Sequence, residues 1–570
     1  MRRTKMDVKI IRGPDYDYER ALKDGKADLR YLPRGFISEV LTSEIYTWSC
    51  DIPVAIFSDT GTGKSSFVEG PLVSFAEAAG CNMIYLSNRV SVGRQTKQRL
   101  AGRFGMEAEL RKYSDEGLDD LIDFGCMKVL SYQKLAAWID SKSSKLDELL
   151  ETRFMYVVMD ECHYFTADAS FSPYTDAVLD FLTENFKDSI RIYLTATPEE
   201  IFPVLKRWEK TQRDPDLWTA LFGREIDWKI YQFEHDFSRF VPHAFVDLED
   251  IAALIRNTPH DEKTIAFVES KEVGEKLIDA CGFGTMITAD SKNPGNRGYD
   301  TLRKITENEC FPERLVVATA VLENGVNLKD TTLKNVVIYA DNKTRFRQML
   351  GRVRKVDEQK IHVFIPDVSA RNISAKLDNL KAQLEACEIY RNDKLRFSQE
   401  YICPTHPRCN VRGALAIGSN GMAHLNPLFA IRLKYCDIPF WERMEADAKA
   451  GIVCPVLQEK FSWIGQRCSA PPFIPKIRAR NAELDLTAFL ERYVGKAIGK
   501  MDQEAFKTEF STKYKAAYGM RAQDKTKDQQ YGISTIRGCL TAQSLPYVIE
   551  RGEEGWMVKR KEREENEEEV

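Results

Sequence analysis

The chain has 570 residues, of which 43% are hydrophobic and 29% are charged, a composition typical of a globular protein with several domains. Its formal net charge of −4 gives no overall attraction to nucleic acid, so such a partner would need a local basic path. The 13 cysteines lack paired spacing and indicate reduced thiols rather than a disulfide framework. Because no apolar run is long enough for a signal peptide or a membrane span, we expect a cytoplasmic protein without membrane contacts.

Short runs of Val, Ile and aromatic residues alternate with polar or helical segments over roughly residues 45 to 370. The first series is PVAIF, NMIYLS, KVLSY, FMYVVMDE and IRIYLTAT, and the second is TIAFVES, GTMITAD, RLVVATA, NVVIYAD and IHVFIPD. Apolar runs of about five residues followed by helical patterns are typical of buried parallel strands with crossover helices. The two series, which are separated near WKIYQFEHDFSRFVPHAF, predict two α/β domains in tandem.

The stretch VAIFSDTGTGKSSFVEG, residues 54 to 70, predicts a strand, a glycine-rich turn and a helix in that order. This is the order of a phosphate-binding loop, in which backbone N–H groups surround a phosphate at a helix N-terminus. Gly61 and Gly63 would allow close approach, Lys64 would reach the β- and γ-phosphates, and Ser65 would ligate Mg²⁺. The pattern G-x-x-x-x-G-K-[ST] has Gly at its first position, where this chain has Ser58, a residue small enough to open the turn.

A second motif, FMYVVMDECHYF at residues 154 to 165, is an apolar strand that ends in two carboxylates, Asp160 and Glu161. Ligands of open α/β sheets bind at the carboxyl ends of the strands, where this pair would lie. Asp160 is suited to hold Mg²⁺ and Glu161 to activate the attacking water. A solvated strand end would be the alternative for this pair taken alone.

Taken in order, SDTGTGKS, DECH and LTAT resemble motifs I, II and III of the superfamily 2 helicases, the DEAD/DEAH-box-like ATPases. YLSNRVSVGRQ resembles motif Ia, and VLSYQKL resembles the strand-end motif that follows it. TIAFVESKEVGEKL, VVATAVLENGVNLKD and RQMLGRVRK are similar to motifs IV, V and VI. The resemblance covers roughly residues 45 to 370 and is nearest to the origin-binding and mobile-element helicases.

This resemblance implies an ATP site between two RecA-like domains with parallel sheets, followed by a mainly helical C-terminal accessory domain. The expected domains are an N-terminal extension (1–45), an ATP-binding domain (46–232), a second RecA-like domain (233–370) and the accessory domain (371–570). The family's catalytic roles fall on Lys64, Asp160, Glu161, Gln348, Arg352 and Arg354. Its nucleotide contacts fall on Ser58, Thr60, Gly61, Thr62, Gly63, Lys64, Ser65, Ser66, Gly325, Asn327 and Lys355, with Mg²⁺ held by Ser65 and Asp160.

Three departures from the family pattern affect this site. Motif VI ends in Lys355 where the family has arginine, so Arg352, Arg354 or Lys355 could act as the arginine finger. Asn327 replaces a frequent aspartate of motif V, which leaves its contact with the ribose or a motif VI arginine open. No adenine-reading glutamine motif precedes Ser58, and we expect loose base selectivity.

The family also implies residues that couple hydrolysis to nucleic acid and residues that contact its backbone. The coupling residues are His163, Thr195 and Thr197. The candidate nucleic-acid contacts are Ser87, Asn88, Arg89, Tyr132, Gln133 and Thr319. Contacts of this kind position a strand without reading its sequence and weaken with salt.

The last 200 residues carry weaker signals. CPTHPRC supplies only Cys403, His406 and Cys409 as metal ligands, and a proline-bounded turn explains it better than zinc. Two helical patterns and a hairpin pattern with Trp556 near residues 500–562 would fit a winged-helix-like module, or a helical domain that packs on the motor.

Three functions remain open at the level of sequence. The favoured one is an ATP-dependent helicase or translocase, with DNA preferred over RNA and with replication or mobile-element proteins as partners. The alternative is a nucleic-acid-stimulated ATPase that clamps or remodels without separating strands. A small-molecule P-loop kinase is disfavoured, because the second domain with GRVRK has no role in one.

Overall fold

The computed structural model describes residues 17–50, 52–88, 90–113, 117–209, 227–322, 326–354, 359–402, 411–417, 423–474, 477–499, 502–518, 521, 524, 526, 529–543, 545–552 and 555–561. The chain divides into two compact units. The first contains Met1–Ala244 and Pro259–Pro472, and the second contains Phe245–Thr258 and Phe473–Val570. The predicted accessory segment, residues 371–570, therefore contributes to both units.

The first domain of unit 1 is built on a sheet in the order β1-β8-β2-β7-β6-β3-β5-β4. Its strands are β1 (Ala27–Leu32), β2 (Val54–Phe57), β3 (Asn82–Ser87), β4 (Asp123–Phe124), β5 (Met127–Ser131), β6 (Phe154–Met159), β7 (Ile190–Thr195) and β8 (Trp228–Phe233). Every pairing is parallel except that of β4 with β5. The central strands β2 and β7 are buried along their whole length, as continuous apolar runs predict. Part of the predicted N-terminal extension supplies the edge strand β1.

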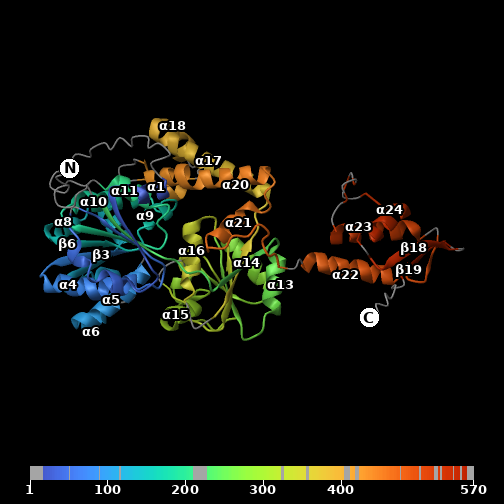
Figure 1. Cartoon of the computed structure of the whole chain (residues 1–570), viewed down its shortest axis with the longest axis horizontal. Coiled ribbons are helices and arrows are strands. Elements are labelled where there is room, and N and C mark those ends of the chain that lie inside the picture. The colour runs from blue at the N-terminus through green and yellow to red at the C-terminus, as the bar shows by residue number, and fades with distance from the viewer. Residues whose placement is uncertain are drawn as a thin grey trace. The chain divides into compact units, whose positions relative to one another are not determined.

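Helices cover both faces of this sheet and give it two apolar layers (Figure 1). They are α1 (Tyr18–Lys23), α2 (Ile37–Leu41), α3 (Lys64–Phe67), α4 (Val73–Ala78), α5 (Val90–Phe104), α6 (Glu107–Leu110), α7 (Tyr132–Ser141), α8 (Ser144–Glu151), α9 (Tyr164–Ala167), α10 (Thr175–Asn185) and α11 (Phe202–Trp208). A π-helical segment, Val68–Leu72, joins α3 to α4 and contains Pro71. Because proline lacks an N–H group, a wider turn at this point lets the helix continue past it.

The second domain has a sheet in the order β11-β12-β10-β13-β14-β9, and the four pairings from β11 to β14 are parallel. Its strands are β9 (Phe240–Phe245), β10 (Lys263–Phe267), β11 (Thr285–Ile287), β12 (Leu315–Ala318), β13 (Leu333–Ile338) and β14 (Ile361–Pro366). Its helices include α14 (Lys271–Cys281), α15 (Tyr299–Asn308) and α16 (Lys343–Arg352). The two RecA-like α/β domains that the sequence predicts are therefore present.

Helices that follow the second domain pack on the cores of both RecA-like domains. They are α17 (Ala370–Asn392), α18 (Lys394–Phe397), α19 (Pro427–Arg432), α20 (Ile438–Lys449) and α21 (Pro455–Ser462), and α17 and α20 run side by side (Figure 1). A short hairpin, β15 (Leu415–Ile417) with β16 (Ala423–Leu425), precedes α19. Leu377 and Phe429 join the core of the first domain, whereas Leu457 and Phe461 join that of the second. These helices thus connect the two domains by apolar contacts.

Unit 2 contains α13 (Leu248–Asn257), α22 (Ile477–Glu491), α23 (Gln503–Tyr518) and α24 (Ile533–Ala542). Its antiparallel sheet has the order β17-β19-β18, formed by β17 (Ala497–Ile498), β18 (Tyr547–Gly552) and β19 (Gly555–Arg560). Aromatic residues such as Phe489, Phe506, Phe510 and Tyr514 build its core. Within the described parts of both units, no helix has the length and apolar character needed to cross a membrane.

Candidate nucleotide site between two RecA-like domains

The phosphate loop leaves the buried strand β2 and ends in α3. Gly61 and Gly63 have φ angles of +89° and +83°, a left-handed conformation in which glycine avoids the strain of a Cβ. Gly63 directly precedes α3. The backbone N–H groups of the loop therefore lie at the N-terminus of this helix, as the glycine spacing predicts.

Ser58 occupies the first position of the loop and is fully buried. Its Oγ lies 3.0 Å from Thr62 Oγ1, which is also 2.8 Å from the Asp59 carbonyl oxygen. These contacts join the two ends of the loop, a role that glycine could not fill. Lys64 Nζ donates to the carbonyl oxygens of Ser58 and Asp59, at 3.0 Å each, and so lies inside the loop.

Asp160 and Glu161 follow β6 at the same edge of the sheet. Asp160 accepts a hydrogen bond from the hydroxyl of Tyr85, which also bonds to Ser65. Burial and the charge of Glu161 raise the pKa of Asp160 to about 6. Burial would also raise the pKa of Glu161, but the charge of Lys64, together with those of arginines from the second domain, outweighs it and lowers that pKa.

Glu161 has a φ angle of +50°, which is unusual for a residue with a Cβ and typical of strained functional positions. Its Oε2 is buried and has no hydrogen-bond partner among the described residues, although it lies 3.4 Å from His163 Nδ1. A buried carboxylate oxygen without a donor is an open acceptor for a water proton.

Ser65 and Asp160 fit the Mg²⁺ that the motifs imply. Both offer oxygen ligands, which Mg²⁺ prefers, and the Tyr85 hydroxyl contacts both of them. A cation at Asp160 would compensate the cost of burying that carboxylate beside Glu161.

The second domain supplies arginine side chains from α16 and the residues after it. Arg354 Nε donates to Asn327 Oδ1 at 2.7 Å, and Arg354 Nη1 lies 2.9 Å from the position that a Cβ on Gly61 would occupy. Nη1 is buried and has no acceptor among the described residues. Burial and the charge of Arg352 lower the pKa of Arg354 to about 10. Arg352 is buried and its charge helps lower the pKa of Glu161.

The contact between Asn327 and Arg354 answers one question that the sequence leaves open. The neutral amide orients the guanidinium group without cancelling its charge. Asn327 Nδ2 in turn donates to Glu309 Oε1 at 3.3 Å, which fixes the orientation of the amide.

His163 joins the two domains through both ring nitrogens. Its Nε2 contacts Gln348 Nε2, and its Nδ1 lies 3.1 Å from Thr195 Oγ1. Because the Gln348 amide nitrogen only donates, His163 Nε2 accepts and the ring proton resides on Nδ1. Thr195 Oγ1 also accepts from the backbone N–H of Thr197 at 3.0 Å. The expected coupling residues thus form one buried chain, from motif III through motif II to motif VI.

Several residues of the site carry no motif signal. Asp59 contacts His235 and accepts from the N–H of Asp236 at 3.3 Å, and Asp236 pairs with Arg34. His235 and Asp236 lie in the link between the two domains, where sequence reasoning expected only a boundary. A half-exposed aromatic residue, Phe36, lies 3.4 Å from the position of a Cβ on Gly63.

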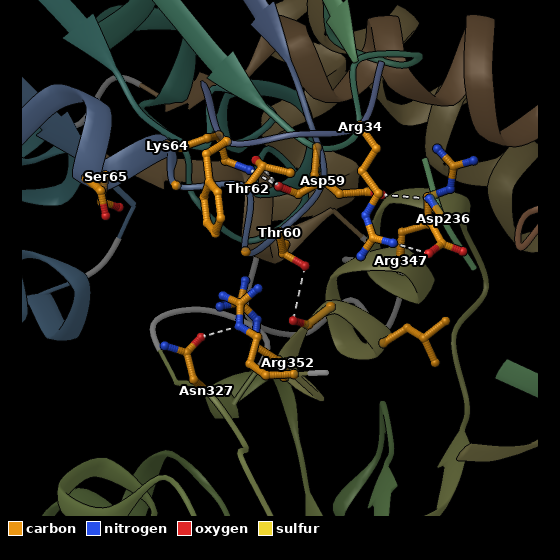
Figure 2. A pocket seen from close by; sticks show the side chains of 18 of the residues that line it. Arg34, Asp59, Thr60, Thr62, Lys64, Ser65, Asp236, Asn327, Arg347 and Arg352 are labelled. Atoms are coloured by element: carbon orange, nitrogen blue, oxygen red, sulfur yellow. Dashed lines mark hydrogen bonds and ion pairs between the residues drawn. The ribbon is translucent and has the colours of Figure 1, made fainter. Parts of the chain in front are cut away.

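These elements enclose a cavity of about 730 Å³, lined by both domains. Figure 2 shows Thr60, Thr62 and Lys64 on one side and Asn327 and Arg352 on the other. Its volume lies in the range of small-molecule sites. Gly61, Gly63, Ser65, Ser66, Asp160 and Glu161 also line it, whereas Gly325 and Lys355 lie outside the described residues.

None of the expected nucleic-acid contacts that the structure describes lines this cavity. Ser87 Oγ and Asn88 Nδ2 are buried without hydrogen-bond partners among the described residues, and Asn88 Oδ1 accepts from Gln133 at 3.1 Å. Thr319 directly follows β12. Tyr132 is fully buried, and its hydroxyl donates to the Asp160 carbonyl oxygen at 3.0 Å, which places it beneath the site.

The remaining predicted positions cannot be placed. Arg89 and the whole CPTHPRC stretch with Cys403, His406 and Cys409 lie outside the described residues. Elsewhere in the described ranges, no group of three or more His, Cys, Asp or Glu side chains could hold a metal ion.

The fold is similar to that of several solved helicases at low sequence identity. S. cerevisiae Dbp5 bound to RNA and ADP BeF3 is 13% identical, over 57% of this chain and 82% of that chain, with a TM-score of 0.37. The DUF1998 helicase MrfA bound to DNA and AMPPNP is 15% identical, over 61% of this chain and 52% of that chain, with a TM-score of 0.38. Escherichia coli DEAH/RHA helicase HrpB is 14% identical, over 59% of this chain and 43% of that chain, with a TM-score of 0.38. Similarity at this level does not transfer a substrate to this chain.

No protein of curated function matches the sequence. Residues 46–200, however, match the family described as ResIII, Type III restriction enzyme, res subunit. This range contains the phosphate loop, the DECH motif and the LTAT strand end. This match bears out the resemblance to superfamily 2 helicases over these residues, and the first domain is similar to the res subunit family.

Proposed function

We propose that this protein is a nucleic-acid-dependent ATPase that hydrolyses ATP between its two RecA-like domains and uses the resulting domain movement to translocate along or unwind nucleic acid. The observation that carries the proposal is the position of Arg354. A buried guanidinium group of the second domain, with a free donor, lies against Gly61 in the phosphate loop of the first. Hydrolysis would then require both domains to be closed on the nucleotide.

Each polar group of the cavity has a place in this reaction. The loop N–H groups and Lys64 would hold the β- and γ-phosphates, and Arg354 would stabilise the charge that develops on the γ-phosphate. Glu161, kept ionised, would orient the attacking water and accept its proton. Bound Mg²⁺ on Ser65 and Asp160 would neutralise phosphate charge. Phe36 offers an aromatic face beside the loop on which the base could stack. Stacking does not depend on the hydrogen-bonding groups of the base, and it would explain loose base selectivity.

The chain from Thr195 through His163 to Gln348 supports coupling of the site to movement. Opening of the domains would separate Gln348 from His163 and break their hydrogen bond, a contact that contributes about 0.5–1.5 kcal/mol. Closure and the arrangement of motifs II and III would therefore change together. We favour DNA as the track, and a replication or mobile-element role remains a prediction.

Steady-state ATP hydrolysis by the full chain tests the proposal. We would measure it alone and with single-stranded DNA, duplex DNA and RNA, with Lys64→Ala as the blank. Glu161→Gln should bind ATP like the wild type and lower kcat by about 100-fold or more, since general-base catalysis typically contributes 10²–10⁴-fold. Hydrolysis that no polymer stimulates would contradict the proposal. A strand-displacement assay then separates unwinding from clamping or remodelling.

A further inference from the structure

After α13, the elements of unit 2 follow the order helix, strand, helix, helix, strand, strand: α22, β17, α23, α24, β18 and β19. The last strand pairs with both others, in the sheet order β17-β19-β18. This order and this pairing define a winged helix, in which the third helix corresponds to the recognition helix of a helix-turn-helix motif. In this unit the third helix is α24.

One face of α24 packs inward and the other is exposed. Ile536, Cys539 and Leu540 are buried in the core of unit 2. Ser534, Arg537 and Thr541 are exposed and recur at i, i+3 and i+7, which places them on one face of the helix. The outer face is therefore polar, with one cation at its centre.

The charge of this segment is opposite to that of the whole chain. Residues 473–561 contain 17 Lys and Arg against 11 Asp and Glu, whereas the chain has a net charge of −4. The acidic residues of 245–258 and of the tail 562–570 bring unit 2 as a whole to 19 Lys and Arg against 20 Asp and Glu, so its excess of cations is local to 473–561. Many of these cations are compensated within the unit: Arg492 pairs with Glu509, Lys513 with Asp485, Arg521 with Asp524, Lys559 with Glu550 and Arg560 with Glu491.

Two arginines, one on α24 and one on β18, are exceptions. Arg537 lies with its guanidinium carbon 4.7 Å from the centre of the Trp556 ring, and its Nε donates to the Ile549 carbonyl oxygen at 2.7 Å. Arg551 is exposed and stands directly opposite Trp556 in the β18–β19 pairing, so both side chains project from the same sheet face. Neither arginine forms an ion pair with a carboxylate among the described residues, although the hydrogen bond and charge of Lys559, followed by the charge of Arg537, lower the pKa of Glu550. The stacked ring holds Arg537 in place at little entropic cost.

We propose that unit 2 binds duplex DNA, with the exposed face of α24 and its Arg537 in the major groove and with Arg551 on a flanking phosphate. The major groove of B-form DNA admits an α-helix, whereas the deep, narrow groove of A-form RNA does not. This inference rests on the proposed function and adds to it the class of nucleic acid, duplex DNA, on which the ATPase would act. Binding itself requires neither ATP nor the nucleotide cavity.

The test uses the full chain without nucleotide and a fluorescent duplex of about 20 base pairs. Ser534→Glu adds a negative charge to the exposed face of α24 at its first turn, where the helix dipole favours it, so the unit should stay folded. Ala488→Glu adds the same charge at an exposed position of α22 and is the matched control. We expect Ser534→Glu to raise the Kd for duplex DNA at least about tenfold, and Ala488→Glu to change it less than twofold.

Arg551→Ala allows a second measurement, the salt dependence of binding, which distinguishes the loss of one phosphate contact from a loss of folding. Removing one phosphate contact should lower the slope of log Kd against log salt by about 0.9. Equal binding by Ser534→Glu and Ala488→Glu, an unchanged salt slope, or equal affinity of the wild type for duplex RNA would each overturn the inference.

The two proposals fail in different ways. If Ser534→Glu loses duplex DNA while no polymer stimulates hydrolysis, the ATPase proposal falls and the duplex-binding assignment stands. If a polymer stimulates hydrolysis and Ser534→Glu binds duplex DNA like its control, the assignment of unit 2 falls and the ATPase proposal stands.

Discussion

Thr60 donates a hydrogen bond of 3.1 Å from its Oγ1 to the carbonyl oxygen of Gly351 and thereby joins the phosphate loop to α16 of the second domain. A Cβ on Gly351 would lie 2.3 Å from that hydroxyl oxygen and 2.8 Å from the Thr60 methyl group. The φ angle of Gly351 is not in the left-handed region, so its backbone conformation does not require glycine. Its lack of a side chain instead allows the two domains to approach closely.

Gly351→Ala should therefore hinder closure and leave nucleotide binding to the first domain intact. We expect kcat for ATP to fall at least about tenfold with little change in the Kd of a fluorescent ATP analogue, since misplacement by about 1 Å is costly to catalysis. Thr60→Ala in the same chain removes the clashing atoms and should restore part of kcat. If the double variant is no faster than Gly351→Ala alone, steric exclusion is not the cause.

Arg354→Ala should lower kcat by about 1,000-fold, the lower bound for an arginine finger. Nucleotide affinity should change much less, because the ground-state phosphates are held mainly by the loop and Lys64. Asn327→Ala should give a smaller loss, since the guanidinium remains but loses the amide that orients it. Steady-state kinetics of both variants checks this. Near-normal kcat in Arg354→Ala together with a large loss in Arg352→Ala would assign the finger to Arg352.

Phe36→Ala should raise KM for ATP about threefold to tenfold with kcat nearly unchanged, as expected for lost stacking worth about 0.5–1.5 kcal/mol. Phe36→Trp should preserve affinity, because only an aromatic face is required. Comparison of KM for ATP and GTP with each variant measures base selectivity. Identical KM values for wild type and Phe36→Ala would exclude contact between this ring and the base.

Glu209→Ala should destabilise unit 1, because it leaves the buried Arg191 without its anion. Arg191 Nε lies 2.8 and 3.0 Å from the two carboxylate oxygens, and both side chains are almost fully buried. Breaking such a pair costs about 3–5 kcal/mol. Because unit 1 is large, we expect this loss to lower the unfolding midpoint in a thermal melt by about 3–5 °C.

Glu148→Ala is the control for that experiment. Glu148 pairs with Lys145 at 2.8 Å, but both side chains are more than half exposed, and pairs of this kind contribute about 0–1 kcal/mol. Equal shifts of the melting midpoint in the two variants would contradict the difference in burial.

Much of the first domain could be predicted from the sequence because its strands and its phosphate loop are encoded by short local patterns. The apolar runs became β2, β3, β5, β6 and β7, and the glycines of the phosphate loop adopt the left-handed conformation that their positions require. The positions of Arg34, Phe36, His235 and Asp236, which complete the site, could not be predicted from the sequence. They come from a loop before β2 and a link after β8, and no periodicity indicates that these segments meet.

The C-terminal third shows the same limit. Its helices and hairpin were visible as patterns, yet the pairing of β17 with β19 is a contact between segments about 60 residues apart. Likewise, Leu377 and Leu457 belong to different cores, which only the packed chain reveals.

The sequence by itself determined the phosphate loop, the acid pair and the two series of strands, because glycine, lysine, carboxylates and buried apolar runs each impose their local conformation or chemistry. Tertiary structure decided which groups face one another: Arg354 against Gly61, Gln348 against His163, and Arg537 on Trp556. The physical reason is that hydrogen bonds, charge and steric exclusion act over a few ångströms in space, whereas these partners lie from 19 to 293 residues apart along the chain.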